Sequence, residues 1–403
     1  MKNMTEFDIY QEQKIDILSP ELKEKVFNVY RAACFEATGC MREGGFGDLA
    51  YVPPIGMERR LVYRAGDGFG TYDHAPALAK FKGRYVLAWN SGKGNEDAPG
   101  QDVLISFSDD GKAWSRPKVV LASNEAERQY YMTAGLYVYK DTLYLFVMEK
   151  YAAAPDSGYS MTANDTAQGR NYNNIWASDD GENWRLVNRN FADLLFMLHP
   201  PALTPKGRLL QSACNFRGRP IVLLWPADNP EEKPCIVELP WPVDERKYRE
   251  GHDLGIWCYG ENCFYSLDDG TIVMLLRNEN GTCQLGVTIS RDDGETWETI
   301  MQSNFPDSAS RLATGRLADG RYFIVGNSTR VYMDRNFFAI SFSPDGRKFN
   351  EMFRLTTDIE RQKHGGELKC HGFQYPCALV DGNRLLIAYS VNKEDIECGT
   401  IEF

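Results

Sequence analysis

A chain of 403 residues with 43% hydrophobic and 25% charged residues has the composition of a folded globular protein. Its formal net charge of −11 argues against nucleic acid or an anionic membrane as a partner, because phosphate binding needs a basic surface. The first residues contain no apolar stretch of signal-peptide length, and no run of about 18 apolar residues follows, so we expect a cytoplasmic protein.

The 10 cysteines are scattered along the chain without a Cys-x-x-Cys pair or another spacing typical of zinc sites. In a reducing compartment we expect most of them to be buried free thiols, and we expect neither a metal nor a cofactor. The alternative is a zinc site on loops, and its candidate ligands are His252, His364, Cys370 and His371.

Residues 1–70 form an N-terminal segment ahead of a series of repeats. Ser19, followed by Pro20 and Glu21, is typical of a helix N-cap with proline at the first helical position, and it predicts a short helix through about Ala33. Residues 5–18 are our candidate for an outer strand that pairs with the last repeat and closes the fold.

A strand, a tight turn and a second strand recur six times within residues 71–403. Each turn contains Gly or Asp and precedes a β-branched or aromatic run, which is typical of a β-hairpin. The hairpins are residues 81–89, 139–147, 204–213, 267–276, 317–326 and 380–389. Their turn centres lie 50 to 66 residues apart, which is enough for the four strands of one propeller blade. The sequence therefore predicts an all-β fold, a six-bladed β-propeller that forms a single domain over residues 1–403.

A second motif, Asp-x-Gly-x-x-Trp, marks the turn between the third and fourth strands of a blade. Its copies are residues 109–114, 179–184 and 292–297, with a degenerate copy at 344–349. Asp can cap such a turn, Gly supplies a positive φ angle, and Trp fills space between blades. Residues 290–297 resemble the complete Asp box of the sialidase superfamily, and we find no leading serine in the other copies. The resemblance implies a structural role on the face opposite the active site.

In a propeller, the first strand of every blade begins beside the central axis on one face, and the second strand returns there. The first strands are expected to start at His74-Ala75-Pro76, Met132-Thr133, His199-Pro200, Glu261-Asn262, Ser310-Arg311 and Tyr375-Pro376. The second strands are expected to end at Asn90, Glu149, Asn215-Phe216-Arg217, Arg277-Asn278, Gly326-Asn327 and Ser390-Val391-Asn392. So many polar side chains in an interior predict a central binding pocket. The alternative is a water-filled axial channel whose polar groups satisfy one another.

Over about residues 70–403, these axial positions resemble the active site of sialidases. The resemblance implies that Tyr375 is the nucleophile, that Glu261 assists it, and that Asp97, with Glu96 next to it, is the acid. It also implies a triad of arginines that holds the substrate carboxylate. Two members of that triad have matches here: Arg277 for the second arginine, and Arg335 or Arg330 for the third.

The first arginine of the sialidase triad begins an Arg-Ile-Pro sequence, whereas this chain has His74-Ala75-Pro76 at that place. Losing an arginine fork would weaken recognition of sialic acid by about 1.5–3 kcal/mol per charged hydrogen bond. His74 and the loop that ends at Gln101 instead resemble propeller enzymes that act on uronic acid and rhamnose linkages, namely rhamnosidases and ulvan lyases. Because those relatives usually have seven blades, a seven-bladed propeller is the alternative fold.

The leading hypothesis is an exo-acting glycoside hydrolase that cleaves an acidic oligosaccharide containing uronic or sialic acid. We expect the catalytic residues to be Tyr375, Glu261, Asp97 and His74. We expect the substrate-binding residues to be Arg277, Arg335, Arg217, His199, Glu96 and Gln101. The second hypothesis is a lyase in which His74 or a tyrosine removes the proton beside a uronate carboxylate. The third is a carbohydrate-binding propeller without catalysis.

Overall fold

The structure is a computed structural model of the chain. It describes residues 36–37, 52–152, 170–192, 195–197, 199–215, 219–240, 261–279, 283–349, 351–356, 358 and 361–403. Within these ranges the regular elements are β-strands, apart from one short 3-10 helix, η2 (Glu125–Glu127). No helix in this part of the chain has the length and apolar character needed to cross a membrane. The helix predicted after Ser19 lies outside the described residues.

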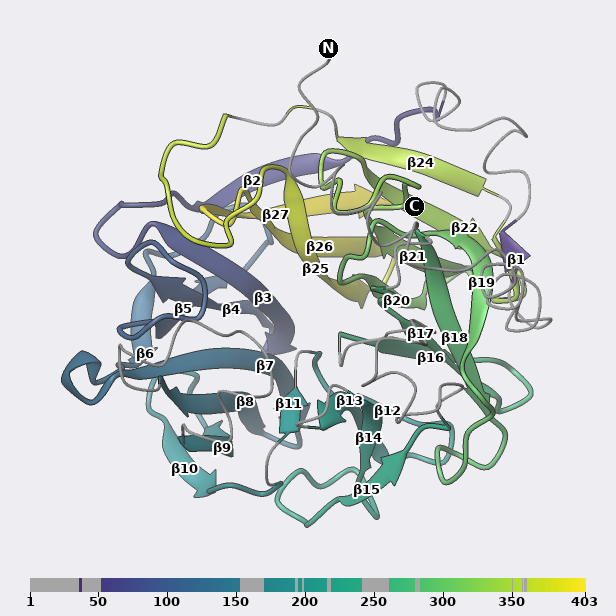
Figure 1. The fold of residues 1–403 in the computed structure, drawn as a ribbon, viewed down its shortest axis with the longest axis horizontal. Coiled ribbons are helices and arrows are strands. Elements are labelled where there is room, and N and C mark those ends of the chain that lie inside the picture. Colours follow the sequence, from purple (N-terminus) through teal and green to yellow (C-terminus); the bar gives the residue numbers. More distant parts are fainter. Residues whose placement is uncertain are drawn as a thin grey trace, which may run out of the picture.

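Six sheets are arranged around a central axis as the blades of a propeller (Figure 1). Blade 1 contains β3 (Tyr72–Phe81), β4 (Arg84–Gly92), β5 (Asp102–Ser108) and β6 (Lys118–Leu121). Blade 2 contains β7 (Gln129–Tyr139), β8 (Thr142–Tyr151), β9 (Arg170–Ser178) and β10 (Arg185–Asn188). Blade 3 contains β11 (Leu195–Met197), β12 (Ala202–Leu203), β13 (Leu209–Asn215), β14 (Pro220–Leu224) and β15 (Cys235–Glu238).

The second half of the ring repeats this order. Blade 4 contains β16 (Cys263–Ser266), β17 (Ile272–Leu276), β18 (Gln284–Ser290) and β19 (Met301–Pro306). Blade 5 contains β20 (Ala313–Arg316), β21 (Tyr322–Gly326), β22 (Phe338–Ser343) and β24 (Glu351–Thr356). Blade 6 contains β25 (Phe373–Asp381), β26 (Arg384–Val391), β27 (Asp395–Glu402) and β2 (Glu58–Tyr63). A further parallel pair joins β1 (Glu36–Ala37) to β23 (Lys348–Phe349). The predicted six-bladed fold is confirmed, and the seven-bladed alternative is wrong.

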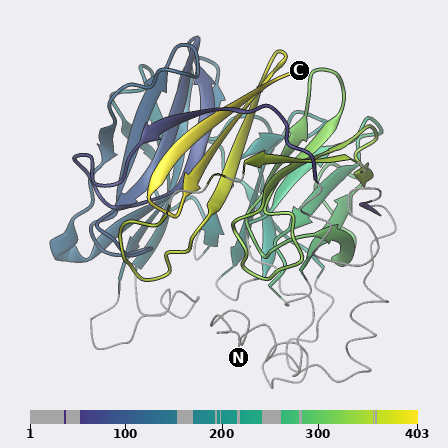
Figure 2. The same cartoon turned by 90° about the horizontal axis from the view of Figure 1, so that it is seen from above.

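The ring is closed by β2, which pairs antiparallel with β27 and completes the last blade. In Figures 1 and 2 this purple strand lies alongside the yellow strands of the chain's other end. The closing strand thus comes from residues 58–63 of the N-terminal segment, whereas residues 5–18, our candidate for it, lie outside the described residues. The sequence of β2 begins with charged residues and its Leu61 is exposed. The strand therefore lacks the apolar alternation that identifies the inner strands.

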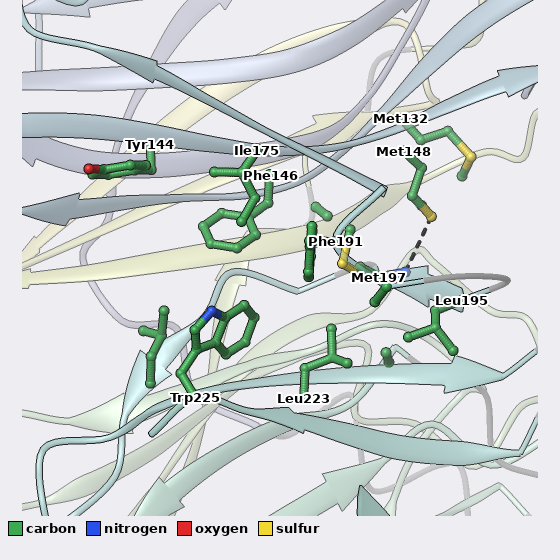
Figure 3. Packing of buried hydrophobic residues seen from close by; sticks show 14 of the residues in the cluster. Met132, Tyr144, Phe146, Met148, Ile175, Phe191, Leu195, Met197, Leu223 and Trp225 are labelled. Atoms are coloured by element: carbon green, nitrogen blue, oxygen red, sulfur yellow. Dashed lines mark hydrogen bonds between the residues drawn. The ribbon is translucent and has the colours of Figure 1, made fainter. Parts of the chain in front are cut away.

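Apolar side chains fill the space between neighbouring blades, as Figure 3 shows for blades 2 and 3. Phe146 of β8 packs edge-to-face against Trp225 at a centroid distance of 6.0 Å, and Phe191 fills the gap beside both rings. The amide nitrogen of Met197 lies 3.2 Å from the sulfur of Met148. Such contacts hold each blade at a fixed angle to the next, which in turn fixes where the inner strands begin.

In all four Asp boxes the aspartate accepts backbone hydrogen bonds within the turn, and all four have a leading serine. In the first copy, Asp110 accepts hydrogen bonds from the amides of Lys112 and Ala113, and Ser108 accepts one from Gly111. The leading serines are Ser108, Ser178, Ser290 and Ser343. Three of these serines do not fit the pattern of residues 290–297, because that copy has one more residue between its serine and glycine. A Cβ on Gly294 would lie 2.9 Å from Leu210, which places this turn tightly against the preceding blade.

The closing strand provides a test of how much the ring depends on β2. Arg59 donates two hydrogen bonds to Glu397 of β27, at 2.9 and 3.0 Å, and both side chains are mostly shielded from solvent. We expect Arg59→Met to lower the free energy of unfolding by about 1.5–3 kcal/mol, because it leaves the Glu397 carboxylate without its bidentate partner. Urea unfolding followed by intrinsic fluorescence measures this change.

Arg60→Met is the matched control on the same strand. Among the described residues, the partner of Arg60 is the exposed Glu58, so its loss should change the free energy of unfolding by less than about 0.5 kcal/mol. Equal effects of the two substitutions would contradict the role assigned to the Arg59–Glu397 pair.

Candidate functional site

Two blades each have a β-bulge of the same kind in the strand nearest the axis. In β3 the register shifts between His74 and Ala77, and in β25 it shifts between Gln374 and Cys377. The bulged residues Ala75 and Tyr375 both have a φ angle of 53°, which residues other than glycine rarely adopt. Bulges commonly redirect a side chain, and strained backbone of this kind often occurs at functional sites.

The two bulges bring His74 and Tyr375 into contact at the axis. The ring centroids lie 4.0 Å apart, with 38° between the ring planes. His74 is 1% exposed, and its Nδ1 lies 2.7 Å from the hydroxyl of Ser390 on β26. The residues that the sequence placed at the starts of the first and sixth inner strands therefore meet in the structure.

Tyr375, Glu261 and Arg277 form a hydrogen-bonded group between blades 6 and 4. The Tyr375 hydroxyl donates to one carboxylate oxygen of Glu261, and Nη1 of Arg277 donates to the other. The same guanidinium nitrogen lies 3.2 Å from the Tyr375 hydroxyl, and Arg277 also pairs with Glu279. The sequence predicted that Tyr375, Glu261 and Arg277 come together, and the structure does bring them together.

Burial sets the protonation states of this group, and the charges around it modify them. Burial and the negative charge of Glu261 raise the pKa of Tyr375 well above its ordinary value. Burial alone would raise the pKa of Glu261 too, but the Arg277 charge and the Tyr375 hydrogen bond hold it below its ordinary value. At neutral pH the group therefore consists of a neutral phenol and an ionised carboxylate that accepts a hydrogen bond from it.

Glu96 lies on the other side of His74 and joins the first-blade loop to blade 6. Its carboxylate accepts hydrogen bonds from Lys393 and, at 3.3 Å, from the Tyr72 hydroxyl. Its Oε1 lies 3.9 Å from Nε2 of His74. Burial and the charges of Lys393 and nearby arginines lower the pKa of His74 well below its ordinary value, so the imidazole is neutral at pH 7.

Asp97 is the member of the predicted site with the properties of a general acid. Burial and the neighbouring charge of Glu96 raise its pKa to about 6, while Lys150 and Lys393 act in the opposite direction. Its amide donates to Oε1 of Gln101 at 3.2 Å, and the amide group of Gln101 donates to the carbonyl of Tyr131 at 2.6 Å. Gln101 thus anchors the Asp97 loop to blade 2 with both ends of its side chain.

Two buried arginines of blade 5 complete the charged centre. Arg335 is 2% exposed, whereas Arg330 is exposed, so Arg335 is the better match for the third arginine of the resemblance. Arg311 is 1% exposed, and its guanidinium carbon lies 5.5 Å from the ring centroid of Tyr375. The sequence placed Arg311 at the start of an inner strand, but we assigned it no role there.

His199 and Asp307 are also buried, and they are engaged in different ways. Nε2 of His199 donates to the carbonyl of Leu312 at 2.8 Å, which joins blade 3 to blade 5. Burial and the charge of Arg311 lower the pKa of His199 well below its ordinary value. Burial raises the pKa of Asp307 to about 7, and no signal in the sequence identified this carboxyl.

Several predicted ligands lie elsewhere or outside the described residues. Arg217 and His252 are outside them. Cys370 donates to Oε1 of Gln374, and Nδ1 of His371 lies 2.7 Å from Oδ1 of Asn336. Within the described ranges no three His, Cys, Asp or Glu side chains are grouped so as to hold a metal ion. The cysteines in these ranges are free thiols, and most of them are buried.

Comparison with known proteins agrees with this architecture. A family model described as a BNR repeat-like domain matches residues 83–387. A search of curated proteins finds no significant match. Among solved structures, one titled sialidase has a TM-score of 0.61 at 20% identity, and the match covers 91% of this chain but only 35% of that one.

Two further solved structures cover nearly the whole length of the matched protein. A protein of unknown function from Dyadobacter fermentans has a TM-score of 0.61 at 18% identity, with 86% of this chain and 99% of that chain covered. The intramolecular trans-sialidase from Ruminococcus gnavus has a TM-score of 0.60 at 13% identity, with 85% and 97% covered. At these identities the likeness establishes a shared fold.

The electrostatics of the first-blade loop can be tested without a substrate. Because the positive charge of Lys393 lowers the pKa of Asp97, we expect Lys393→Met to raise that pKa above about 6. Titration of the aspartate carboxyl carbons by NMR measures the shift. Lys112→Met, which removes a lysine paired with Glu58 in the closing strand, is the control and should leave the Asp97 titration unchanged. An unchanged Asp97 pKa in Lys393→Met would contradict the proximity described above.

Proposed function

The chain belongs to the BNR repeat-like domain family, and we propose that it is an exo-acting glycoside hydrolase that removes an acidic sugar from an oligosaccharide. The observation that carries this proposal is the hydrogen-bonded group of Tyr375, Glu261 and Arg277 at the axis. A phenol that donates to a buried carboxylate supplies a nucleophile with its base. Asp97, whose pKa is raised by burial and by the charge of Glu96, supplies a candidate general acid from the first-blade loop.

In the proposed first step, the Tyr375 oxygen forms a bond to the anomeric carbon and its proton passes to Glu261. The bond from the anomeric carbon to the leaving oxygen breaks, and Asp97 donates its proton to that oxygen. As its proton passes to Glu261, the Tyr375 oxygen gains the negative charge that stabilises the positive charge developing on the sugar ring. In the second step water attacks the anomeric carbon, Asp97 takes the water proton, and Tyr375 recovers its own proton from Glu261. The anomeric configuration is retained.

The buried cations around this group support an acidic substrate. Arg277, Arg311 and Arg335 all act on the pKa of His74, as does Lys393. A carboxylate on the sugar would be attracted into a centre of this kind, whereas a neutral sugar would leave buried charge without compensation.

A lyase is the second candidate, and the state of His74 is the observation that favours it. Its imidazole is neutral, and Nε2 is buried without a hydrogen-bond partner. A neutral imidazole next to arginines can remove the proton beside a uronate carboxylate.

Product analysis separates the two reactions. We expect incubation with sialylated and uronic-acid-containing oligosaccharides in ¹⁸O-labelled water to give products that together gain one labelled water, detected by mass spectrometry. An unsaturated uronate without added water would establish the lyase instead. If no oligosaccharide of the panel is cleaved, the result contradicts both reactions and favours a carbohydrate-binding propeller without catalysis.

The roles of Tyr375 and Glu261 predict the effect of removing either one. We expect Tyr375→Phe and Glu261→Gln each to lower kcat by about 10²–10⁴-fold, because each loses the nucleophile or the base of the first step. Steady-state kinetics on the cleaved oligosaccharide measures this.

Tyr144→Phe is the matched control, since Tyr144 also donates to a glutamate, Glu231 at 2.7 Å, but outside the centre. Its kcat should stay at the wild-type value. Full activity in Tyr375→Phe and in Glu261→Gln would rule out the proposed mechanism.

The raised pKa of Asp97 predicts the pH dependence of the reaction. The acid must be protonated to donate, and its pKa is about 6, so we expect kcat/KM to fall as the pH rises through about 6. On the acid side, activity should fall only when Glu261 becomes protonated, below the ordinary pKa of a glutamate. Asp97→Asn should abolish the alkaline limb, while Asp102→Asn, outside the centre, should keep it.

A further inference from the structure

Two arginines of blade 5 are buried without an anionic partner in the part of the chain that the structure describes. Arg311 is 1% exposed and Arg335 is 2% exposed, and Nε and Nη1 of both lack hydrogen-bond partners. Among the described residues, neither guanidinium has a carboxylate within ion-pair distance. Burying an uncompensated charge is costly, so a protein retains such a pair where a ligand supplies the missing anion.

Arg277 differs from these two arginines. It pairs with Glu261 and with Glu279, so two carboxylates already face one guanidinium. A substrate carboxylate placed against Arg277 would be the third negative charge around one positive charge. The positive charge available for a substrate therefore lies on Arg311 and Arg335.

The segments that carry Arg311 and Arg335 are joined by hydrogen bonds within blade 5. Nη2 of Arg335 donates to the carbonyl of Ala309 at 2.9 Å, two residues before Arg311. Asn327 bridges the two segments, since it accepts from the Ser310 hydroxyl at 2.8 Å and donates to the Arg335 carbonyl at 3.2 Å. Both guanidinium charges lower the pKa of His74 across the axis.

The positions of the arginines relative to Tyr375 distinguish two classes of acidic sugar. Arg277 lies at the hydroxyl end of Tyr375, 3.2 Å from the oxygen, whereas Arg311 lies over the ring. In a sialate the carboxylate is attached to the anomeric carbon, so attack by Tyr375 would bring that carboxylate to Arg277. In a hexuronate the carboxylate is attached to C5, across the ring oxygen from the anomeric carbon, and it can lie away from the Tyr375 hydroxyl.

We propose that Arg311 and Arg335 form a two-arginine clamp for the C5 carboxylate of a hexuronic acid, and that the substrate is a uronide. The choice of sugar rests on the proposed function, whereas the clamp itself is a binding site that exists without catalysis. Asp307 acts on Arg335 through space but makes no ion pair with it, and burial raises its pKa to about 7. At neutral pH this carboxyl is therefore ionised only in part, and it forms no ion pair with either arginine of the clamp.

Binding of monosaccharides tests the clamp apart from turnover. The probes are D-glucuronate, N-acetylneuraminate and D-glucose, and their affinities are measured by saturation-transfer NMR. We expect the wild-type protein to bind D-glucuronate, and to bind D-glucose and N-acetylneuraminate at least about tenfold more weakly. Tighter binding of N-acetylneuraminate than of D-glucuronate would overturn the proposal, and so would the absence of D-glucuronate binding.

Arginine variants locate the binding within the blade. We expect Arg311→Met and Arg335→Met each to weaken D-glucuronate binding at least about tenfold. Arg316→Met is the matched control, because Arg316 belongs to the same blade but pairs with Asp268 on the surface. Wild-type affinity in Arg311→Met and Arg335→Met would overturn the clamp. If Arg311→Met fails to fold, Arg335→Met decides the question alone.

Stability gives a second readout that a merely structural arginine would not produce. Without ligand, Arg311→Met should raise the midpoint of thermal unfolding, because it removes a buried charge that has no partner. D-glucuronate should raise the midpoint of the wild-type protein but not that of Arg311→Met. A lower midpoint in Arg311→Met without ligand would show that the charge is already compensated, and would contradict the proposal.

The failure of the clamp and the failure of the proposed function give different results. If D-glucuronate binding depends on Arg311 but no uronide is hydrolysed in labelled water, the clamp stands and the hydrolase does not. If uronides are hydrolysed equally well by wild type and Arg311→Met, the hydrolase stands and the clamp does not.

Discussion

The pairing of β2 with β27 is the constraint on which the central site depends. It joins the two ends of the described propeller into one blade, so the six inner strands surround a common axis instead of forming an open row. Only in a closed ring can Tyr375 of blade 6 contact both His74 of blade 1 and Glu261 of blade 4. Closure also removes free sheet edges, which would otherwise invite pairing with other chains.

Convergence at the axis brings polar groups together where water is scarce, and the structure compensates most of them in pairs. Glu96 is balanced by Lys393, and Glu261 is balanced by Arg277. His199 uses Nε2 to join two blades, which makes it part of the framework. Arg311 and Arg335 differ from these pairs, because a buried charge without a partner lowers the stability of the fold.

Local signals carried most of the fold prediction. Each hairpin is specified by its own turn and the run that follows, so a regular spacing of such hairpins was sufficient to count the blades. The closing strand could not be found this way, because pairing of residues 58–63 with β27 is a long-range choice made by a half-exposed strand. The positions of Tyr375, Glu261 and Arg277 followed from blade geometry, whereas the significance of Arg311 and Asp307 depends on which partners they lack. Whether a side chain has a partner depends on its neighbours in space, which the sequence does not give.

The difference between this chain and the sialidase pattern is a redistribution of charge around the axis. An arginine in place of His74 would stand among Lys393, Arg277, Arg311 and Arg335, whose charges already lower the pKa of the imidazole. A neutral histidine avoids that repulsion and still packs against the Tyr375 ring. Blade 1 thus lacks the arginine that sialidases have at the position of His74. Blade 5 instead supplies a cation, Arg311, which lies over the ring of Tyr375. In the mechanism we propose, the Tyr375 oxygen keeps its place beside Glu261, so moving the cation would change which carbon of the sugar can carry the carboxylate without changing the bond that is attacked.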